Sequence, residues 1–176
     1  MKHLHDKSFK LFITEAQLAE QIERLGKELT IKYKDENPIF LVVLNGAFMF
    51  AADLMKTLDF NCEIHFIKLA SYDGLTSSGN VQTLIGLTQS IENRAVIIVE
   101  DIVDTGRTLH QLMPELKILQ PKSISICALL QKPDALTVDL KVDFVGFEIP
   151  NKFVVGYGLD YDNLGRNFPA IYQLDF

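Results

Sequence analysis

The sequence has few cysteines and no excess of positive charge. Of its 176 residues only Cys62 and Cys127 are cysteines, and they form no CxxC pair. We interpret both as reduced thiols of a cytoplasmic protein. Lysine and arginine number 17 against 23 acidic residues, which gives a formal net charge of −6. This balance argues against a protein whose main task is to coat nucleic acid or an anionic membrane.

Long hydrophobic runs are also missing. No apolar run approaches the roughly 20 residues that a membrane span requires. The segment from Met1 to Lys10 is polar and contains no apolar signal region. We therefore expect neither a membrane nor a nucleic acid as partner. Hydrophobic residues make up 48 % and charged residues 23 %, the balance of an ordinary globular protein.

Apolar residues at helical spacing predict three helices. The first follows a capping box formed by Thr14 and Gln17. Pro114 lies inside the third pattern, so we expect it to kink that helix or to shift its start. The helices are expected at residues 15–34, 47–58 and 108–119.

Continuous apolar runs and alternating patterns predict strands. The three strongest runs are typical of parallel strands that are buried on both faces. Residues 71–80 are rich in glycine, serine and threonine, so we expect a mobile loop there. The tail after residue 157 is expected to be mostly irregular. The strands are expected at residues 39–44, 64–70, 83–87, 95–99, 123–130, 144–149 and 153–157.

Alternation of strands and helices predicts an α/β fold with a mainly parallel, doubly wound sheet. The length fits a single domain over residues 1–176, which can bury a sizeable core. We expect its core at about 14–140. Residues 1–13 and 141–176 are expected to pack together as a small hood over the carboxyl edge of the sheet. His3 and His5 form an HxH pair at an end that we expect to be frayed, so we interpret them as non-functional.

Ligands of open α/β sheets bind outside the carboxyl ends of the strands, here at residues 44–47, 100–108 and 130–134. At the second junction a buried strand runs into Glu100 and Asp101, two carboxylates that are costly to desolvate unless a ligand or cation uses them. The polar loop Asp104–Thr108 then opens a helix and offers N–H groups and hydroxyls suited to a phosphate. Together they indicate a ribose hydroxyl pair beside a 5′-phosphate. A simple strand-turn-helix with Asp104 as N-cap is the alternative.

The run from Val96 to Leu109, VIIVEDIVDTGRTL, closely resembles the phosphoribosyl-diphosphate binding signature of type I phosphoribosyltransferases. Residues Asp143 to Asp160, DFVGFEIPNKFVVGYGLD, resemble the purine-recognition segment of hypoxanthine-guanine phosphoribosyltransferases. The match extends from about Leu11 to Tyr172. It implies the type I phosphoribosyltransferase fold, with its hood lobe.

By that resemblance, Glu100 and Asp101 hold the ribose 2′- and 3′-hydroxyls, and both count among the expected metal ligands. The 5′-phosphate lies in the loop formed by Asp104, Thr105, Gly106, Arg107 and Thr108. Asp104 also faces N7 of the purine as general base.

The same resemblance assigns the base and diphosphate contacts. Lys132 donates to the exocyclic O6, Phe153 stacks on the base, and Val154 contacts the base edge. Asp160 binds a magnesium ion on the diphosphate, and Arg166 grips the diphosphate directly.

The implied reaction is purine salvage. Hypoxanthine or guanine and 5-phosphoribosyl 1-diphosphate give IMP or GMP and diphosphate, with Mg²⁺ as cofactor. The loop from Ser71 to Asn80 would act as a lid, with Ser71 and Tyr72 closing over the diphosphate. The family also implies a homodimer or homotetramer.

One junction departs from the family. Many relatives have a basic residue where this chain has Asn45 before Gly46. The family's loop binds diphosphate through backbone groups, often across a non-proline cis peptide, for which Leu44–Asn45 is the candidate bond. The backbone donors of Asn45 and Gly46 remain, although the basic side chain is lost.

Other functions stay open on the sequence. The chain could be a phosphoribosyltransferase for xanthine or a pyrimidine, although Lys152–Asp160 favours a 6-oxopurine. It could be a regulator that has lost catalysis, although no DNA-binding domain or basic surface is visible. A dinucleotide-dependent oxidoreductase is disfavoured because Gly156-Tyr157-Gly158 is followed by Tyr161 where the fingerprint needs glycine.

Overall fold

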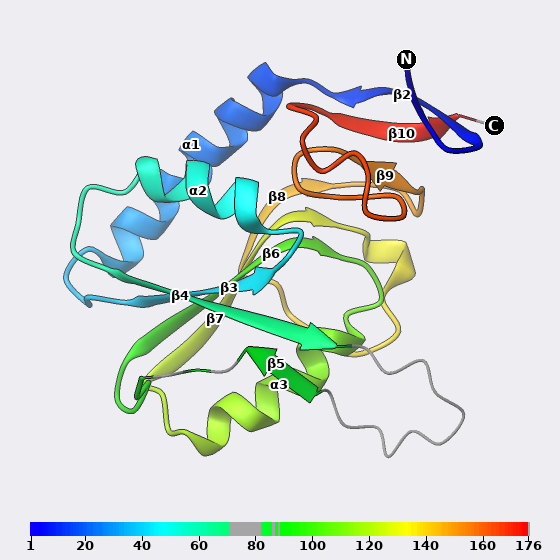
Figure 1. The fold of residues 1–176 in the computed structure, drawn as a ribbon. Coiled ribbons are helices and arrows are strands. Elements are labelled where there is room, and N and C mark those ends of the chain that lie inside the picture. Colours follow the sequence, from blue (N-terminus) through cyan, green and yellow to red (C-terminus); the bar gives the residue numbers. More distant parts are fainter. Residues whose placement is uncertain (71–81, 86, 88, 176) are drawn as a thin grey trace.

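The computed structural model describes residues 1–70, 82–85, 87 and 89–175 (Figure 1). The whole of the expected lid from Ser71 to Asn80, including Tyr72, lies outside the described residues. Within the described part of the chain, no helix is long and apolar enough to cross a membrane.

A six-stranded sheet forms the centre of the molecule, in the order β5-β4-β3-β6-β7-β8. Five strands run parallel, and β5 is antiparallel to β4, as the expected short hairpin strand requires. The parallel sheet predicted from the apolar runs is thus confirmed. The strands are β3 (Ile39–Leu44), β4 (Glu63–Ala70), β5 (Gln82–Ile85), β6 (Ala95–Val103), β7 (Ser123–Gln131) and β8 (Phe144–Glu148).

Helices cover both faces of this sheet. Helices α1 (Glu15–Tyr33) and α2 (Phe48–Lys56) lie on one face, and α3 (Arg107–Ile118) lies on the other (Figure 1). Alternate residues of β3 enter the two cores, with Phe40 facing α1 and α2 and Leu41 facing α3. Because both faces are covered, the strands are continuously apolar rather than alternating.

Two local expectations concern the helices. The capping box is present, since the Gln17 N–H donates to Thr14 Oγ1 at 3.3 Å and the Thr14 N–H donates to Gln17 Oε1 at 2.9 Å. Pro114 lies inside α3, but the helix begins at Arg107, so the proline does not delay its start.

A second, antiparallel sheet forms the hood, in the order β1-β2-β10-β9. It joins chain segments from both ends of the sequence, and in Figure 1 the red β10 lies beside the blue β2. The hood predicted from the two terminal segments is therefore present. Its strands are β1 (Lys2–Leu4), β2 (Lys7–Ile13), β9 (Val154–Val155) and β10 (Ile171–Asp175).

Three details of the hood differ from expectation. The tail after residue 157 is irregular as far as Ala170, as expected, but it ends in the unpredicted strand β10, which pairs with both β2 and β9. The first ten residues are not frayed, since they form β1 and most of β2. Strand β8, which we placed in the hood segment, pairs with β7 in the central sheet. The chain therefore crosses to the hood only after Glu148.

Candidate active site

Strand β6 is four residues longer than predicted and carries both acidic residues of the second junction. Glu100 pairs with Ala128 and Ile102 with Leu130, so the carboxylates belong to the strand rather than to the loop. Glu100 lines a cavity on the α3 side, whereas Asp101 lies against Gly46 of the β3–α2 loop. Burial raises the pKa of the Glu100 carboxyl well above its ordinary value, and the neighbouring charge of Asp101 raises this pKa further. The ionised form of Glu100 is therefore costly to bury unless a ligand or cation interacts with its carboxylate.

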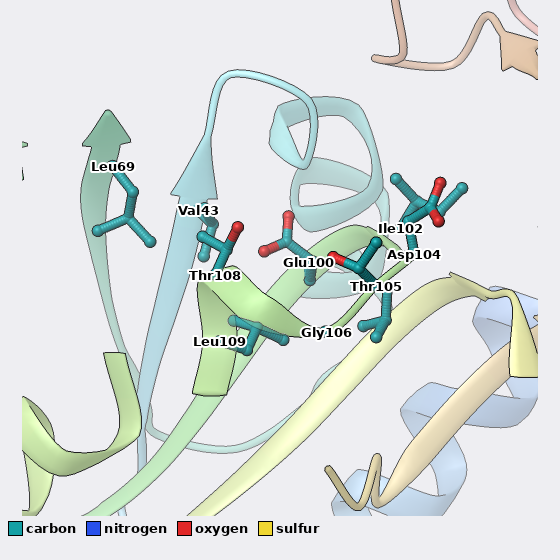
Figure 2. Close-up of a pocket in the computed structure, with 10 residues that line it drawn as sticks. Val43, Leu69, Glu100, Ile102, Asp104, Thr105, Gly106, Thr108 and Leu109 are labelled. Carbon is teal, nitrogen blue, oxygen red and sulfur yellow. The ribbon is translucent and has the colours of Figure 1, made fainter. Parts of the chain in front are cut away.

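The cavity has a volume of about 210 Å³ and lies between the ends of β3, β4 and β6 and the start of α3. Figure 2 shows Glu100, Thr105 and Thr108 around it, with Asp104 further along the loop. The Arg107 side chain instead donates from Nε to Thr137 Oγ1 at 3.1 Å. An acid, two hydroxyls and the N-terminus of a helix thus meet in one hollow, a combination suited to a sugar phosphate.

Gly106 is the N-cap of α3 and has a φ of 76°, in the left-handed region that favours glycine. A Cβ here would also lie 3.0 Å from Val138 and 3.1 Å from Leu136. Thr137, between these two residues, donates its N–H to the Thr105 carbonyl at 3.1 Å. Sequence reasoning missed this support for the loop, because nothing in residues 136–138 signals a contact with it.

Asp104 is not the N-cap of α3, so that alternative was wrong. Its carboxylate instead accepts a hydrogen bond from Lys132 Nζ at 2.5 Å. Lys132 follows the end of β7, and its side chain is only 7 % exposed, whereas the Asp104 side chain is 46 % exposed. The Lys132 N–H also donates to the Val103 carbonyl at 2.9 Å. Two neighbouring strands therefore place a buried cation against an accessible carboxylate at the rim of the cavity.

Phe153 and Val154 lie in the hood. Val154 is buried in β9, but Phe153 just before it is 45 % exposed. The Phe153 ring is backed by Phe9, with ring centroids 6.3 Å apart, and by Tyr161, edge-on at 5.8 Å. These two aromatic supports were not predicted. They hold an exposed ring of the kind on which a flat base can stack.

Asp160 and Arg166 form an ion pair, with Asp160 Oδ1 and Arg166 Nη2 2.7 Å apart. Arg166 also donates from Nη1 to the Gly158 carbonyl at 2.8 Å. Burial raises the pKa of the Asp101 carboxyl, and the positive charge of Arg166 lowers this pKa and so partly offsets the effect of burial. The expected diphosphate residues of the hood thus lie within electrostatic reach of β6.

The β3–α2 loop lies between β6 and the hood. Its Leu44–Asn45 peptide bond is cis, at the position that the resemblance indicated. A Cβ on Gly46 would collide with the Asp101 carboxylate, and a Cβ on Gly158 would collide with the Gly46 carbonyl oxygen. Glycine at both positions lets the two backbones and the carboxylate come together.

The expected metal ligands Glu100, Asp101 and Asp160 do not form a protein-only cage. Among residues 1–70, 82–85, 87 and 89–175 no three His, Cys, Asp or Glu side chains gather so as to hold a metal ion. Magnesium commonly takes one or two carboxylates and completes its shell with water and substrate phosphates. A carboxylate such as Asp160 is enough for that mode of binding.

Comparison with known proteins defines the class. A family model described as the phosphoribosyl transferase domain matches residues 13–162. The fold is therefore that of a phosphoribosyltransferase, and the chain belongs to this class of enzyme.

Comparison with individual relatives identifies the family within this class. The chain is 45 % identical to a hypoxanthine-guanine phosphoribosyltransferase of Bacillus subtilis, over 92 % of this chain and 91 % of the relative. A crystal structure of a hypoxanthine-guanine phosphoribosyltransferase from Bacillus anthracis superposes with a TM-score of 0.90 at 36 % identity, covering 97 % of this chain and 99 % of that one. The chain belongs to the hypoxanthine-guanine phosphoribosyltransferase family.

Some relatives are much longer. The bifunctional protein TilS/HprT of Listeria monocytogenes is 44 % identical over 96 % of this chain, but the chain spans only 26 % of its length.

Proposed function

We propose that the protein transfers the 5-phosphoribosyl group from 5-phosphoribosyl 1-diphosphate to hypoxanthine or guanine, giving IMP or GMP and diphosphate. The observation that carries this purine-salvage function is the pair formed by the buried Lys132 and the accessible Asp104 at the rim of a cavity lined by Glu100 and the start of α3. It supplies a proton acceptor, hydrogen-bond donors and a phosphate cradle within one site.

The Lys132–Asp104 pair accounts for base recognition. A lysine ammonium has three donors and no acceptor, so Lys132 can keep Asp104 and still donate to a 6-oxo group. Adenine presents an amino group at that position, whose hydrogens face the ammonium unfavourably. Asp104, half exposed, accepts the N7 proton as the bond to the ribose forms. Phe153 stacks on the base, and Val154 contacts its edge through backbone groups.

The cavity accounts for the phosphoribosyl group. Glu100 accepts hydrogen bonds from ribose hydroxyls inside the cavity, and Asp101 does so from the side of the β3–α2 loop. The 5′-phosphate binds to the N–H groups of Thr105–Thr108, at the positive end of α3. Ligand hydroxyls give the buried Glu100 carboxylate the partners that offset its burial.

The hood and the β3–α2 loop account for the leaving diphosphate. Its oxygens bind the backbone N–H groups of Asn45 and Gly46 and the guanidinium of Arg166. Asp160 would hold the magnesium ion that the diphosphate carries, and this ion would supply positive charge to the leaving group.

The test is an assay with phosphoribosyl diphosphate and Mg²⁺, offering hypoxanthine, guanine, xanthine and adenine in parallel. Nucleotide formation is followed by ultraviolet absorbance, with a chelator-treated control. We expect rapid, metal-dependent turnover of hypoxanthine or guanine and little of adenine. Turnover of xanthine alone would move the proposal to another base, and binding of phosphoribosyl diphosphate without turnover of any base would indicate a non-catalytic regulator.

We further propose that the enzyme acts in the cytoplasm as a homodimer or homotetramer. Both cysteines are free thiols, as expected where disulfides are kept reduced. Phe48, Ile64 and Phe66 on α2 and β4 are more than 40 % exposed, which supports contact with a second copy. Light scattering on the eluting protein gives the mass, and a strictly monomeric enzyme would contradict this assignment.

A further inference from the structure

Tyr157 lies in a turn whose backbone is unusual for a bulky residue. Its φ is 50°, and its neighbours Gly156 and Gly158 have φ values of 100° and 101°. Glycine adopts such values freely, but tyrosine does so only at a cost. A strained conformation of this kind persists when the surroundings hold it, and it is often found near functional sites.

A hydrogen bond to α2 holds Tyr157 in this turn. The Tyr157 side chain is buried, and its hydroxyl donates to Asp53 Oδ2 at 2.5 Å. Burial and this bond raise the pKa of Tyr157, so the hydroxyl stays protonated and remains a donor. The other Asp53 oxygen accepts from Lys56 Nζ at 2.8 Å. Asp53 therefore anchors the hood turn to a helix of the core.

The anchored elements are the two sides of the proposed diphosphate subsite. Helix α2 follows the Asn45–Gly46 loop directly, and Gly158 packs against the Gly46 carbonyl. The Gly158 carbonyl accepts from Arg166, and Asp160 comes two residues later. Tyr157 and Asp53 themselves line a separate groove between α1 and α2. Their side chains thus lie behind the subsite.

We propose that Tyr157 and Asp53 are positioning residues for the diphosphate subsite. Their hydrogen bond sets the spacing between the hood turn, with Arg166 and Asp160, and the loop that carries Asn45 and Gly46. The inference rests on the proposed function and adds residues that determine the affinity for phosphoribosyl diphosphate rather than for the base.

The decisive variant is Tyr157→Phe, which removes the hydroxyl and keeps the ring. We expect the KM for phosphoribosyl diphosphate to rise about three- to tenfold, the size expected for one hydrogen bond. The KM for hypoxanthine should change less than twofold. Asp53→Ala should have the same effect, and the double variant should be no worse than either single variant. Asp53→Asn should keep the wild-type KM for phosphoribosyl diphosphate, because its amide oxygen still accepts the hydrogen bond.

Tyr33→Phe is the matched control. It also removes a buried tyrosine hydroxyl, which donates to Ser125 Oγ at 2.7 Å on the far side of the core. A merely structural role predicts that both tyrosine variants lower the Tm and leave both KM values unchanged. That result would overturn the inference.

Calorimetric titration of each variant with magnesium phosphoribosyl diphosphate separates this inference from the proposed reaction. If the wild type turns over no purine base, the proposed function fails. A selective loss of phosphoribosyl-diphosphate affinity in Tyr157→Phe would still support the positioning role, and equal affinity in wild type and Tyr157→Phe would refute it.

Discussion

The Lys132 ammonium lies 2.5 Å from the Asp104 carboxylate, although the two residues are 28 positions apart in the chain. A buried cation is stable only with a partner of this kind, and Lys132 is almost fully buried. The partner is the half-exposed carboxylate that we propose as general base. Each residue therefore fixes the other, and substituting them separately distinguishes proton transfer from base selection.

Asp104→Asn should lower turnover with hypoxanthine by about 10²- to 10⁴-fold, the usual contribution of a general base. The amide keeps the size of the side chain but cannot accept the N7 proton. The KM for phosphoribosyl diphosphate should stay within a few-fold of wild type, because the N–H groups of the phosphate loop remain. Steady-state kinetics measure both, and near-normal turnover would exclude the general-base role.

Lys132→Ala should weaken discrimination between hypoxanthine and adenine by about 10- to 100-fold, the value of a hydrogen bond from a charged donor. Without the ammonium, the 6-oxo group loses its donor and the 6-amino group loses an unfavourable neighbour. The ratio of kcat/KM for the two bases is the measurement. Lys152→Ala, in the same segment of the chain as Phe153, is the control. An unchanged ratio in Lys132→Ala would count against the assigned contact.

Glu100→Gln should stabilise the free protein at neutral pH while weakening substrate binding. The pKa of Glu100 is raised in the folded state, so the folded protein holds this proton more tightly than the unfolded chain. Stability is then lost as the pH rises above the ordinary pKa of glutamate. The variant should gain about 2–4 °C in Tm for each kcal/mol relieved, and the gain should vanish below about pH 4.

Thermal unfolding between pH 4 and 8 tests this expectation, with Glu20→Gln on the exposed surface of α1 as control. A Tm difference between Glu100→Gln and wild type that does not grow with pH would contradict it. The same variant should bind magnesium phosphoribosyl diphosphate more weakly, because the neutral amide is a poorer acceptor for ribose hydroxyls.

Gly158→Ala should destabilise the protein by about 1–3 kcal/mol, as for other substitutions that overfill a packed site. Its φ of 101° is unfavourable for alanine, and the added Cβ would collide with the Gly46 backbone. Since backbone atoms cannot move aside like a flexible side chain, the hood turn must shift. Urea unfolding measures the loss of stability. A midpoint equal to that of wild type would show that the two loops are not in close contact.

The core of the fold was readable from the sequence because parallel strands buried on both faces are apolar throughout. The end of β6 was not predicted, because Glu100 and Asp101 interrupt the apolar pattern. The backbone pairing of β6 with β7 nevertheless continues to Val103. Strand β10 was also missed. It depends on pairing with β2, more than 150 residues earlier in the sequence, and its own residues carry little local signal.

The candidate site divides in the same way. The loop Asp104–Thr108 can be recognised in the sequence by its consecutive polar residues before a helix. In contrast, Thr137, Asp53 and Tyr157 act through contacts with distant segments, and each is an ordinary residue in its local pattern. Sequence therefore indicates the groups that meet a ligand more readily than the groups that hold them in place.

The hood sheet also sets an order of assembly during synthesis. Domains generally begin to fold from the N-terminal side as the chain emerges, and all strands of the central sheet precede residue 149. The Phe153 carbonyl, however, accepts from the Leu174 N–H at 2.9 Å. While Ile171–Asp175 is still inside the ribosome, the central sheet and the phosphate loop Asp104–Thr108 can already form. Phe153, on which the base is proposed to stack, then still lacks its neighbouring strand β10. The hood side of the base site, where Phe153 lies, is therefore the last part to be completed.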